Sequence, residues 1–254
     1  MIAEKFNLKG KTALVTGSSQ GIGKGIALAL AEYGADIIIH YRSEKDEADQ
    51  VAEEIRTLGS RVWLIQSDLS ENAAVPNMVD RLQQMVKTID ILVINASVQL
   101  PATWEDTKED EIDIQFNTNF KSTFLLIQLI APQMIASGWG RILTIGSVQQ
   151  IKPHPNMLIY AATKSAVLNL VQNMAMQLAD KGITVNNLAP GVIGTARIEE
   201  EVPESEERIN KRMETPSGKI GNTEDCAAMA LLLCSEAGNF ITGQNIFVDG
   251  GMSL

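Results

Sequence analysis

Short apolar runs alternate with longer amphipathic stretches along most of the chain. Residues 89–94 read Ile-Asp-Ile-Leu-Val-Ile, which predicts a strand buried on both faces of a sheet. The amphipathic stretches predict helices, the first of which places Ile22, Ile26 and Leu30 on one face. The predicted strands span residues 12–15, 36–41, 61–66, 89–94, 141–145, 184–188 and 245–248. The later predicted helices span residues 44–58, 71–87, 109–136, 160–179 and 223–234.

This strict alternation of strand and helix predicts the fold class. It is typical of α/β proteins, in which each helix returns the chain to the next parallel strand. No stretch resembles a linker, and a chain of 254 residues that is 45% hydrophobic is sufficient for one large core. We therefore expect a single domain over residues 1–254, a Rossmann-type fold with a doubly wound parallel sheet.

One segment, residues 193–219, interrupts this regular pattern. It contains the acidic runs 199–201 and 206–207 and the prolines Pro203 and Pro216. Long excursions from a compact α/β domain often form lids over a binding site. We expect a substrate lid here, although a solvated surface helix would have the same composition.

Charge and cysteine usage exclude several classes of partner. The formal net charge of −10 and the absence of a basic run argue against nucleic acid. Cys226 and Cys234 lie in an apolar helical pattern without metal-ligand spacing, so we expect buried thiols in a reducing cytosol and no metal site. The longest apolar stretch, residues 124–136, contains Gln128 and Pro132 and is too short to span a bilayer. We expect a cytoplasmic protein with no membrane partner.

A glycine cluster connects the first predicted strand to the first helix. Residues 16–23 read Thr-Gly-Ser-Ser-Gln-Gly-Ile-Gly. Glycine lets the backbone turn sharply and approach a pyrophosphate, which then faces the N–H groups and the positive end of the helix dipole. The strand-turn-helix context makes this a predicted dinucleotide site. The candidate residues are Gly17, Ser19, Gln20, Gly21, Ile22 and Gly23.

The end of the second strand indicates which dinucleotide binds. NAD sites place a carboxylate there to hold the ribose hydroxyls, whereas this chain has His40-Tyr41-Arg42-Ser43. The guanidinium of Arg42 suits a 2′-phosphate, and Ser43 and Lys24 offer further donors. We predict a preference for NADP(H), with NAD(H) possible.

Tyr160 and Lys164 are four residues apart in a predicted helix. This spacing places a phenol and an ammonium on one helix face, one turn apart. A free tyrosine is a reluctant base at neutral pH, but a neighbouring ammonium favours its phenolate. Such a pair can exchange a proton with an alkoxide.

Together these motifs resemble those of the short-chain dehydrogenase/reductase family. The resemblance covers essentially the whole chain in the same order, and Ser147 stands at the family's usual separation before Tyr160. It is also carried by Asn95-Ala96-Ser97, Asn119, Pro190-Gly191 and Val248-Asp249-Gly250-Gly251. It implies an NAD(P)-dependent oxidoreductase that acts on CH–OH or C=O groups.

The resemblance also implies catalytic roles. Tyr160 is the general acid/base, and Lys164 favours its ionisation and binds the nicotinamide ribose. Ser147 donates a hydrogen bond to the substrate oxygen and stabilises charge that builds on it. Asn119 holds a water in a proton relay from Lys164, with Asn117 as the alternative candidate.

Further cofactor contacts are implied in the same way. Asp68 and Leu69 resemble the pair beside the adenine ring, and Asn95 resembles the residue supporting the sheet next to the cofactor. The segment 190–195 resembles the one beside the nicotinamide, where Ile193 and Thr195 bond the carboxamide. The remaining candidates from these motifs are Tyr41, Ala96, Tyr160, Lys164, Pro190 and Gly191.

Two positions depart from the family pattern. Ser97 stands where the family usually has glycine, and Gln20 stands where many NADP(H)-preferring members have Arg or Lys. The Asn-Ala-Ser ending and the His-Tyr-Arg-Ser stretch resemble pteridine reductases within the family. Those enzymes typically carry Asp at the position of Ser147, so the resemblance to them is partial.

The loop after Ser147 bears on the substrate. Gln149, His154 and Asn156 can hydrogen-bond a hydroxylated compound, which favours a sugar, a polyol or a related hydroxy/keto substrate. A 3-oxoacyl thioester is the main alternative, since its reductases share fold and catalytic set. The acidic lid argues against an acidic carrier protein.

A non-enzymatic alternative is a catalytically silent nucleotide-binding protein. Such a protein does not need Tyr160, Lys164 and Ser147 together, so the intact set favours an enzyme. The resemblance further implies a homotetramer joined through the helices at 109–136 and 160–179 and the C-terminal strand. The apolar tail at 246–254 is consistent with burial at such an interface.

Overall fold

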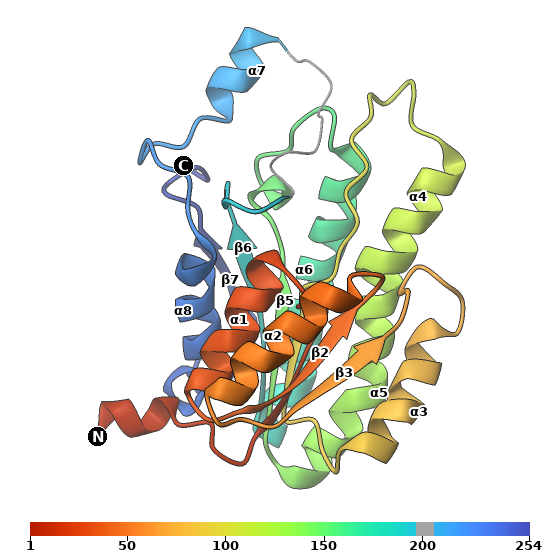
Figure 1. Ribbon diagram of the computed structural model, residues 1–254. Helices are drawn as coiled ribbons and strands as arrows, with labels where there is room; N and C mark the ends of the chain where they lie inside the picture. Colours follow the sequence, from red (N-terminus) through yellow and green to blue (C-terminus); the bar gives the residue numbers. More distant parts are fainter. Residues whose placement is uncertain (197–205) are drawn as a thin grey trace.

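The computed structural model of the chain contains one parallel sheet (Figure 1). It describes residues 1–196 and 206–254, so the part of the predicted lid at 197–205 lies outside the described residues. The strand order is β3-β2-β1-β4-β5-β6-β7, which confirms the predicted doubly wound sheet. The strands are β1 (Thr12–Val15), β2 (Asp36–Tyr41), β3 (Val62–Gln66), β4 (Ile91–Ile94), β5 (Gly140–Ile145), β6 (Ile183–Pro190) and β7 (Asn245–Val248).

Helices cover both faces of this sheet (Figure 1). On one face lie α1 (Gly21–Glu32), α2 (Lys45–Thr57) and α8 (Thr223–Cys234). On the other lie α3 (Ala74–Met85), α5 (Ser122–Ser137) and α6 (Leu158–Leu178). The remaining described helices are α4 (Glu109–Phe116), α7 (Glu207–Arg212), the π-helix η2 (Asn117–Lys121) and the 3-10 helices η1 (Ile2–Phe6), η3 (Val148–Gln150), η4 (Ala179–Lys181) and η6 (Glu236–Gly238).

The central strands are apolar on both faces because each face meets a different core. Ala13 and Val15 of β1 pack in the core beneath α1, α2 and α8. Leu14 between them packs in the core beneath α3, α5 and α6. Successive side chains of a strand point to opposite faces, so a continuous apolar run is what a doubly covered sheet requires.

Two predicted helices differ from the observed ones by more than two residues at an end or by an interruption. The helix predicted from residue 71 begins at Ala74, because Ala73 adopts a left-handed conformation with φ of 62°. The helix predicted over 109–136 is interrupted by the wide π turn of η2, which connects α4 to α5. The π turn matters for the site, since it contains Asn119.

The strand order creates a crevice at the carboxyl edge of the sheet. The chain moves outward in one direction from β1 through β2 to β3, and in the other from β4 through β5 to β7. Loops on either side of such a switch point diverge and leave room for a ligand above the strand ends. Figure 1 shows α7 projecting beyond the sheet and the last residue lying near the top of α8.

His40, at the end of β2, holds the glycine turn against the neighbouring strand end. Gly17 N–H donates to His40 Nδ1 (3.1 Å), and His40 Nε2 lies 3.1 Å from the carbonyl oxygen of Ser67. These partners require a neutral ring that carries its proton on Nε2. The ring is only 2% exposed, and this burial lowers the pKa of His40 from 6.5 to about 4.

We expect His40 to make the folded protein sensitive to acid. The pKa in the folded state lies below that of the unfolded chain, so its contribution is complete above pH 6.5 and is lost as the pH falls towards 4. A shift of this size is worth about 3 kcal/mol of the free energy of unfolding. His40→Asn should flatten the pH dependence of that free energy between pH 4 and 7, measured by urea unfolding at fixed protein concentration.

His154→Asn is the matched control, because it removes the other histidine of the chain. It should change the pH dependence less, since His154 is a weaker case of the same burial effect. Equal acid sensitivity of the His40 variant and the unsubstituted protein would refute this account.

Candidate active site

A cleft of about 1170 Å³ opens at the carboxyl edge of the sheet. Most of the candidate residues line it, although they come from segments spread over the whole chain. They are Gly17, Ser19, Gln20, Gly21, Ile22, Arg42, Asp68, Leu69, Asn95, Ala96, Ser147, Gln149, His154, Tyr160, Lys164, Pro190, Gly191, Ile193 and Thr195. Five other candidates do not line the cleft: Gly23, Tyr41, Ser43, Asn119 and Asn156.

The glycine turn can hold a pyrophosphate. Gly17 has φ of +62°, and a Cβ there would lie 3.0 Å from the Cα of Ala96. A Cβ on Gly23 would collide with the carbonyl of Gly17, so Gly23 acts by close packing of α1 on the turn. Helix α1 begins at Gly21, so its first N–H groups and its positive dipole end face the cleft.

Asn95 fixes this turn to the end of β4. Its Nδ2 donates to the carbonyl oxygens of Thr16 (3.0 Å) and Gly17 (2.9 Å). The hydroxyl of Thr16 in turn accepts from the N–H groups of Asn95 (2.9 Å) and Ala96 (3.0 Å). The sequence pointed to Asn95 as a support of the sheet, and these bonds show what it holds.

The end of β2 carries both signs of charge. Arg42 lines the cleft together with Glu44 and Asp68. Burial raises the pKa of both carboxyls, but hydrogen bonds and the charge of Arg42 outweigh it, so both pKa values are lowered. The four-residue window 40–43 contains no carboxylate, but Glu44 supplies one immediately after it.

Two donors expected near Arg42 are already bonded to acids. The hydroxyl of Ser43 donates to Glu44 (2.9 Å), and the ammonium of Lys24 pairs with Glu54 (2.8 Å). Among the side chains that the structure describes along the cleft, the cations are therefore Arg42 and Lys164.

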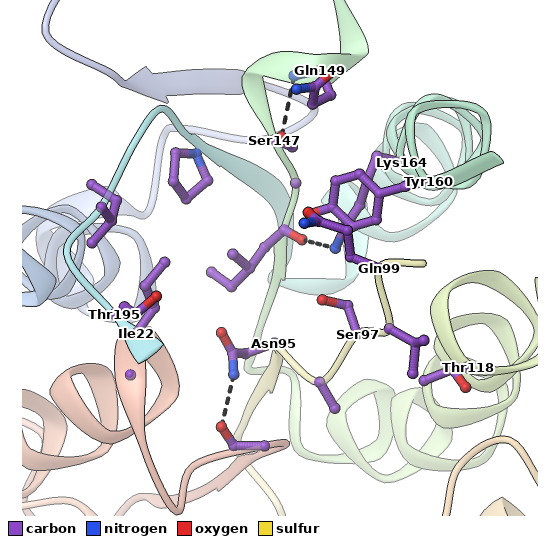
Figure 2. A pocket seen from close by; sticks show the side chains of 18 of the residues that line it. Ile22, Asn95, Ser97, Gln99, Thr118, Ser147, Gln149, Tyr160, Lys164 and Thr195 are labelled. Atoms are coloured by element: carbon purple, nitrogen blue, oxygen red, sulfur yellow. Dashed lines mark hydrogen bonds between the residues drawn. The ribbon is translucent and has the colours of Figure 1, made fainter. Parts of the chain in front are cut away.

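Tyr160 and Lys164 project from α6 into the other end of the cleft, facing the turn that carries Ser147 (Figure 2). Their side chains are almost enclosed, at 6% and 5% exposure. Lys164 Nζ donates to the carbonyl of Ile145 (2.6 Å) and lies 5.4 Å from the centroid of the Tyr160 ring. Helical spacing and an anchor on β5 therefore hold the ammonium beside the phenol.

Ser147 begins the short helix η3. Its Oγ accepts a hydrogen bond from the N–H of Gln149 (3.1 Å), as in a helix N-cap. This bond uses one lone pair of the hydroxyl oxygen, and the O–H group can donate to another acceptor. A substrate oxygen beside Tyr160 would be such an acceptor.

Asn119 lies behind the cleft, in the π turn. Its amide group exchanges two hydrogen bonds of 2.8 Å with the backbone of Val98, and its Nδ2 also donates to Thr163 Oγ1 (3.1 Å). It therefore ties the loop after β4 to the helix that carries Tyr160. Asn117, the alternative candidate, lines a different and much smaller hollow beside α3.

The loop after Ser147 is held by its own polar groups. Gln149 Oε1 accepts from His154 N–H (2.6 Å), and His154 Nδ1 accepts from Asn156 N–H (3.2 Å). Burial lowers the pKa of His154, so its ring is neutral at pH 7. Asn156 also bonds Ala102 through its carbonyl (3.0 Å), so it supports the loop rather than lining the cleft.

The sequence-based list of site residues omits several residues that line the cleft. One of them, Gln99, lies in the loop after the central strand β4, where polar residues are expected at the edge of the sheet. Asn210 and Met213 fall within the segment predicted as a lid, whereas the local sequence does not mark Met157 or Met252 as lining residues. The omitted residues include Ser97, Gln99, Leu100, Met157, Asn210, Met213 and Met252.

The part of the chain that the structure describes contains neither a helix suited to span a membrane nor a cluster of metal-binding side chains. None of the helices within residues 1–196 and 206–254 combines the length and the hydrophobicity that a membrane span requires. The same residues contain no group of three or more His, Cys, Asp or Glu side chains placed to hold a metal ion.

Known proteins share this fold and this length of chain. A family model described as enoyl-(acyl carrier protein) reductase matches residues 17–253. The 3-oxoacyl-[acyl-carrier-protein] reductase of Staphylococcus epidermidis is 35% identical over 244 residues, covering 96% of this chain and 99% of the relative.

Two crystal structures extend the comparison. A 3-oxoacyl (acyl-carrier-protein) reductase from Agrobacterium tumefaciens, with NADP bound, has a TM-score of 0.90 and 36% identity, over 99% of this chain and 97% of its own. A gluconate 5-dehydrogenase from Burkholderia cenocepacia, in complex with NADP and tartrate, has a TM-score of 0.88 and 35% identity, over 100% and 99%. With the motifs assembled around one cleft, these matches show that the chain belongs to the short-chain dehydrogenase/reductase family.

Proposed function

We propose that the protein is an NADP(H)-dependent oxidoreductase that interconverts a hydroxyl and a carbonyl group on a small polar substrate, such as a sugar, a polyol or a related hydroxy/keto compound. The composition of the cleft beside Tyr160 carries this choice. Neutral polar side chains line the cleft there: Gln99 and Gln149 (Figure 2), and His154. Asn210 of α7 adds a further amide to the lining of the cleft. Amides and a neutral imidazole recognise hydroxyl groups in both directions, as donors and as acceptors.

The chain's own groups suit proton transfer at the substrate oxygen. The cofactor, when bound, supplies or accepts the hydride. Tyr160 exchanges the proton with the substrate oxygen, and the ammonium of Lys164 favours the phenolate form. Ser147 donates to the same oxygen and stabilises its negative charge. The proposed role of Asn119 is to hold the water that relays a proton from Lys164, while its side-chain amide bonds Val98 and Thr163.

The cofactor preference rests on Arg42. It is the described cation at the end of the cleft where the adenine ribose of a dinucleotide on the glycine turn would lie. A guanidinium binds phosphate oxygens in a bidentate manner. The relatives from Agrobacterium and Burkholderia were crystallised with NADP, which supports the same cofactor here.

A 3-oxoacyl thioester is the second candidate substrate. Leu100, Met157, Met213 and Met252 give the substrate end of the cleft an apolar side, which suits an acyl chain. Two of the relatives are 3-oxoacyl reductases. Asn210 and Met213 line the cleft from α7 and its end, which supports a lid role over either substrate for the described part of the segment 193–219.

The assembly we propose is a homotetramer in the cytoplasm. Exposed apolar side chains are present on the helices expected at the interfaces, among them Phe124 of α5 and Met176 of α6, the latter 84% exposed.

The proposed cytoplasmic location rests on the two cysteines. Cys226 and Cys234 are free, buried thiols, and burial raises the pKa of each to about 12. Inert reduced thiols fit a reducing compartment.

A panel of carbonyl and alcohol substrates tests the function. We expect oxidation of NADPH with keto-sugars and related hydroxy-ketones, followed by absorbance at neutral pH, and little turnover of acetoacetyl thioesters. Turnover of acetoacetyl thioesters alone would favour the second candidate.

Tyr160→Phe tests the mechanism. It should lower kcat by about 10²–10⁴-fold, because general acid/base catalysis contributes that much. Tyr33→Phe, on the surface of the molecule, should leave kcat unchanged. Full activity of Tyr160→Phe would contradict the mechanism.

Arg42→Ala tests the cofactor preference. Loss of a charge-assisted bond to the 2′-phosphate, worth about 1.5–3 kcal/mol, should lower kcat/KM for NADPH by roughly 10- to 100-fold. The kcat/KM for NADH should hardly change, because NADH has no 2′-phosphate. Lys24→Ala is the control, since its ammonium is paired with Glu54, and it should affect both cofactors little. Equal losses with NADPH and NADH would show that Arg42 does not read the phosphate.

Light scattering coupled to gel filtration tests the assembly. We expect a mass four times the 27.6 kDa of one chain. Met176→Glu should reduce this mass, because a charge buried at an apolar interface is unfavourable. Leu58→Glu, which places a charge at the end of α2 on the opposite face of the sheet, should leave it unchanged. A single-chain mass for the unsubstituted protein would exclude the tetramer.

A further inference from the structure

Two amide side chains that the proposed chemistry does not use, Gln150 and Asn187, lie directly behind the catalytic residues. Gln150 sits at the end of η3, and its Nε2 donates to the main-chain carbonyl of Lys164 (2.8 Å). Its Oε1 accepts from the N–H of Ser147 (3.4 Å) and from Asn187 Nδ2 (3.1 Å). One side chain therefore contacts both the turn that carries Ser147 and the helix that carries Tyr160 and Lys164.

Asn187 connects this contact to the sheet. It is fully buried in β6, and its Oδ1 accepts from the hydroxyl of Thr144 in β5 (2.7 Å). Its Nδ2 donates to Asn245 Oδ1 in β7 (2.6 Å) as well as to Gln150. A buried amide whose bonds run to both neighbouring strands has little freedom to move.

The backbone leaves room for this pair. A Cβ on Gly146 would lie 2.7 Å from Gln150 Oε1 and would collide with the amide of Asn187. The residue between β5 and Ser147 is therefore one without a side chain, which lets the two amides meet beneath the turn.

We infer that Gln150 and Asn187 are positioning residues that set the placement of the Tyr160–Lys164 turn of α6 relative to Ser147. The inference rests on the roles proposed for Ser147, Tyr160 and Lys164, and it holds for either candidate substrate. Lys164 is held twice, through its ammonium to Ile145 at the end of β5 and through its carbonyl to Gln150 in the segment after β5. The two bonds lie on different parts of the residue, so together they fix both the helix and the side chain.

Loss of the amide bridge has a predictable electrostatic consequence. Without Gln150, the carbonyl of Lys164 loses its bond to the turn that carries Ser147, while the bond from its ammonium to Ile145 remains. The phenol moves with α6, whereas the ammonium stays bonded to Ile145. A small movement of α6 then changes the distance between the two groups, and the phenolate is less favoured. Tyr160 should lose its proton at a higher pH, and a displacement of about 1 Å at the reacting groups can cost about 100-fold in rate.

The test compares Gln150→Met and Asn187→Ala with Asn186→Ala. Methionine keeps the length of glutamine but makes no such hydrogen bonds, so this variant is the one least disturbed in packing. Asn186 is the neighbour of Asn187 in the same strand, and its amide bonds Ile241 and Gln244, away from the catalytic residues. It reproduces the loss of a buried amide without touching the bridge.

The first readout is the titration of Tyr160, followed by the ultraviolet absorbance of its phenolate without substrate or cofactor. Each curve is the difference between a variant and the same variant with Tyr160→Phe, which removes the signals of Tyr33 and Tyr41. We expect the midpoint to move to higher pH in Gln150→Met and in Asn187→Ala, and to stay in place in Asn186→Ala. A common midpoint for all three variants and the unsubstituted protein would overturn the inference.

The second readout is turnover with the best substrate of the panel. We expect kcat to fall roughly 10- to 100-fold in Gln150→Met and Asn187→Ala, with KM for NADPH nearly unchanged, because the cofactor contacts at the glycine turn are intact. Asn186→Ala should lose stability but keep kcat. A shifted titration together with no turnover of any panel compound would support the bridge and reject the proposed function, so the two can fail separately.

Discussion

Burial of a sheet that is apolar on both faces is the constraint on which the rest of the structure depends. Leu14 and Val15 are adjacent in β1 and yet belong to two separate cores, so neither face can be left to solvent. Helices must cover both, and each must return the chain to the start of a parallel strand. The carboxyl ends of all the strands then lie at one edge of the sheet, where the loops that follow them line the cleft.

The same constraint explains why the active site is built from buried polar groups. At the carboxyl edge the strands end among side chains that water does not reach freely, so each polar atom needs a partner within the protein. His40 accepts from Gly17, Asn95 donates to the glycine turn, and Asn187 bonds both neighbouring strands. These residues also hold segments that face the cleft. The same hydrogen bonds therefore satisfy the buried polar atoms and position the active site.

The parts of the fold and of the site that the sequence predicts are those marked by a local pattern of residues. The strands, most helices, the glycine turn and the Tyr160–Lys164 pair follow from periodicity and short spacing, and the predicted strand and helix bounds mostly agree with the observed ones to within two residues. The π turn at 117–121 has no such signal, and the late start of α3 depends on the conformation of a single alanine. Met252 reaches the cleft only through the tertiary fold, and the sequence around Met213 indicated a lid without marking this residue as part of the lining. Gln150 and Asn187 are ordinary polar residues until β5, β6 and α6 bring them together.

The charges around Arg42 show why the sequence window alone gave an incomplete account of cofactor recognition. The absence of a carboxylate at Tyr41 removes the usual partner of the ribose hydroxyls, but Glu44 and Asp68 both feel the charge of Arg42 from within the cleft. A phosphate dianion must compete with these two carboxylates for the guanidinium. The proposed preference for NADP(H) therefore depends on the balance of one cation, Arg42, against two carboxylates, and on the geometry of these three groups rather than on the presence of arginine alone.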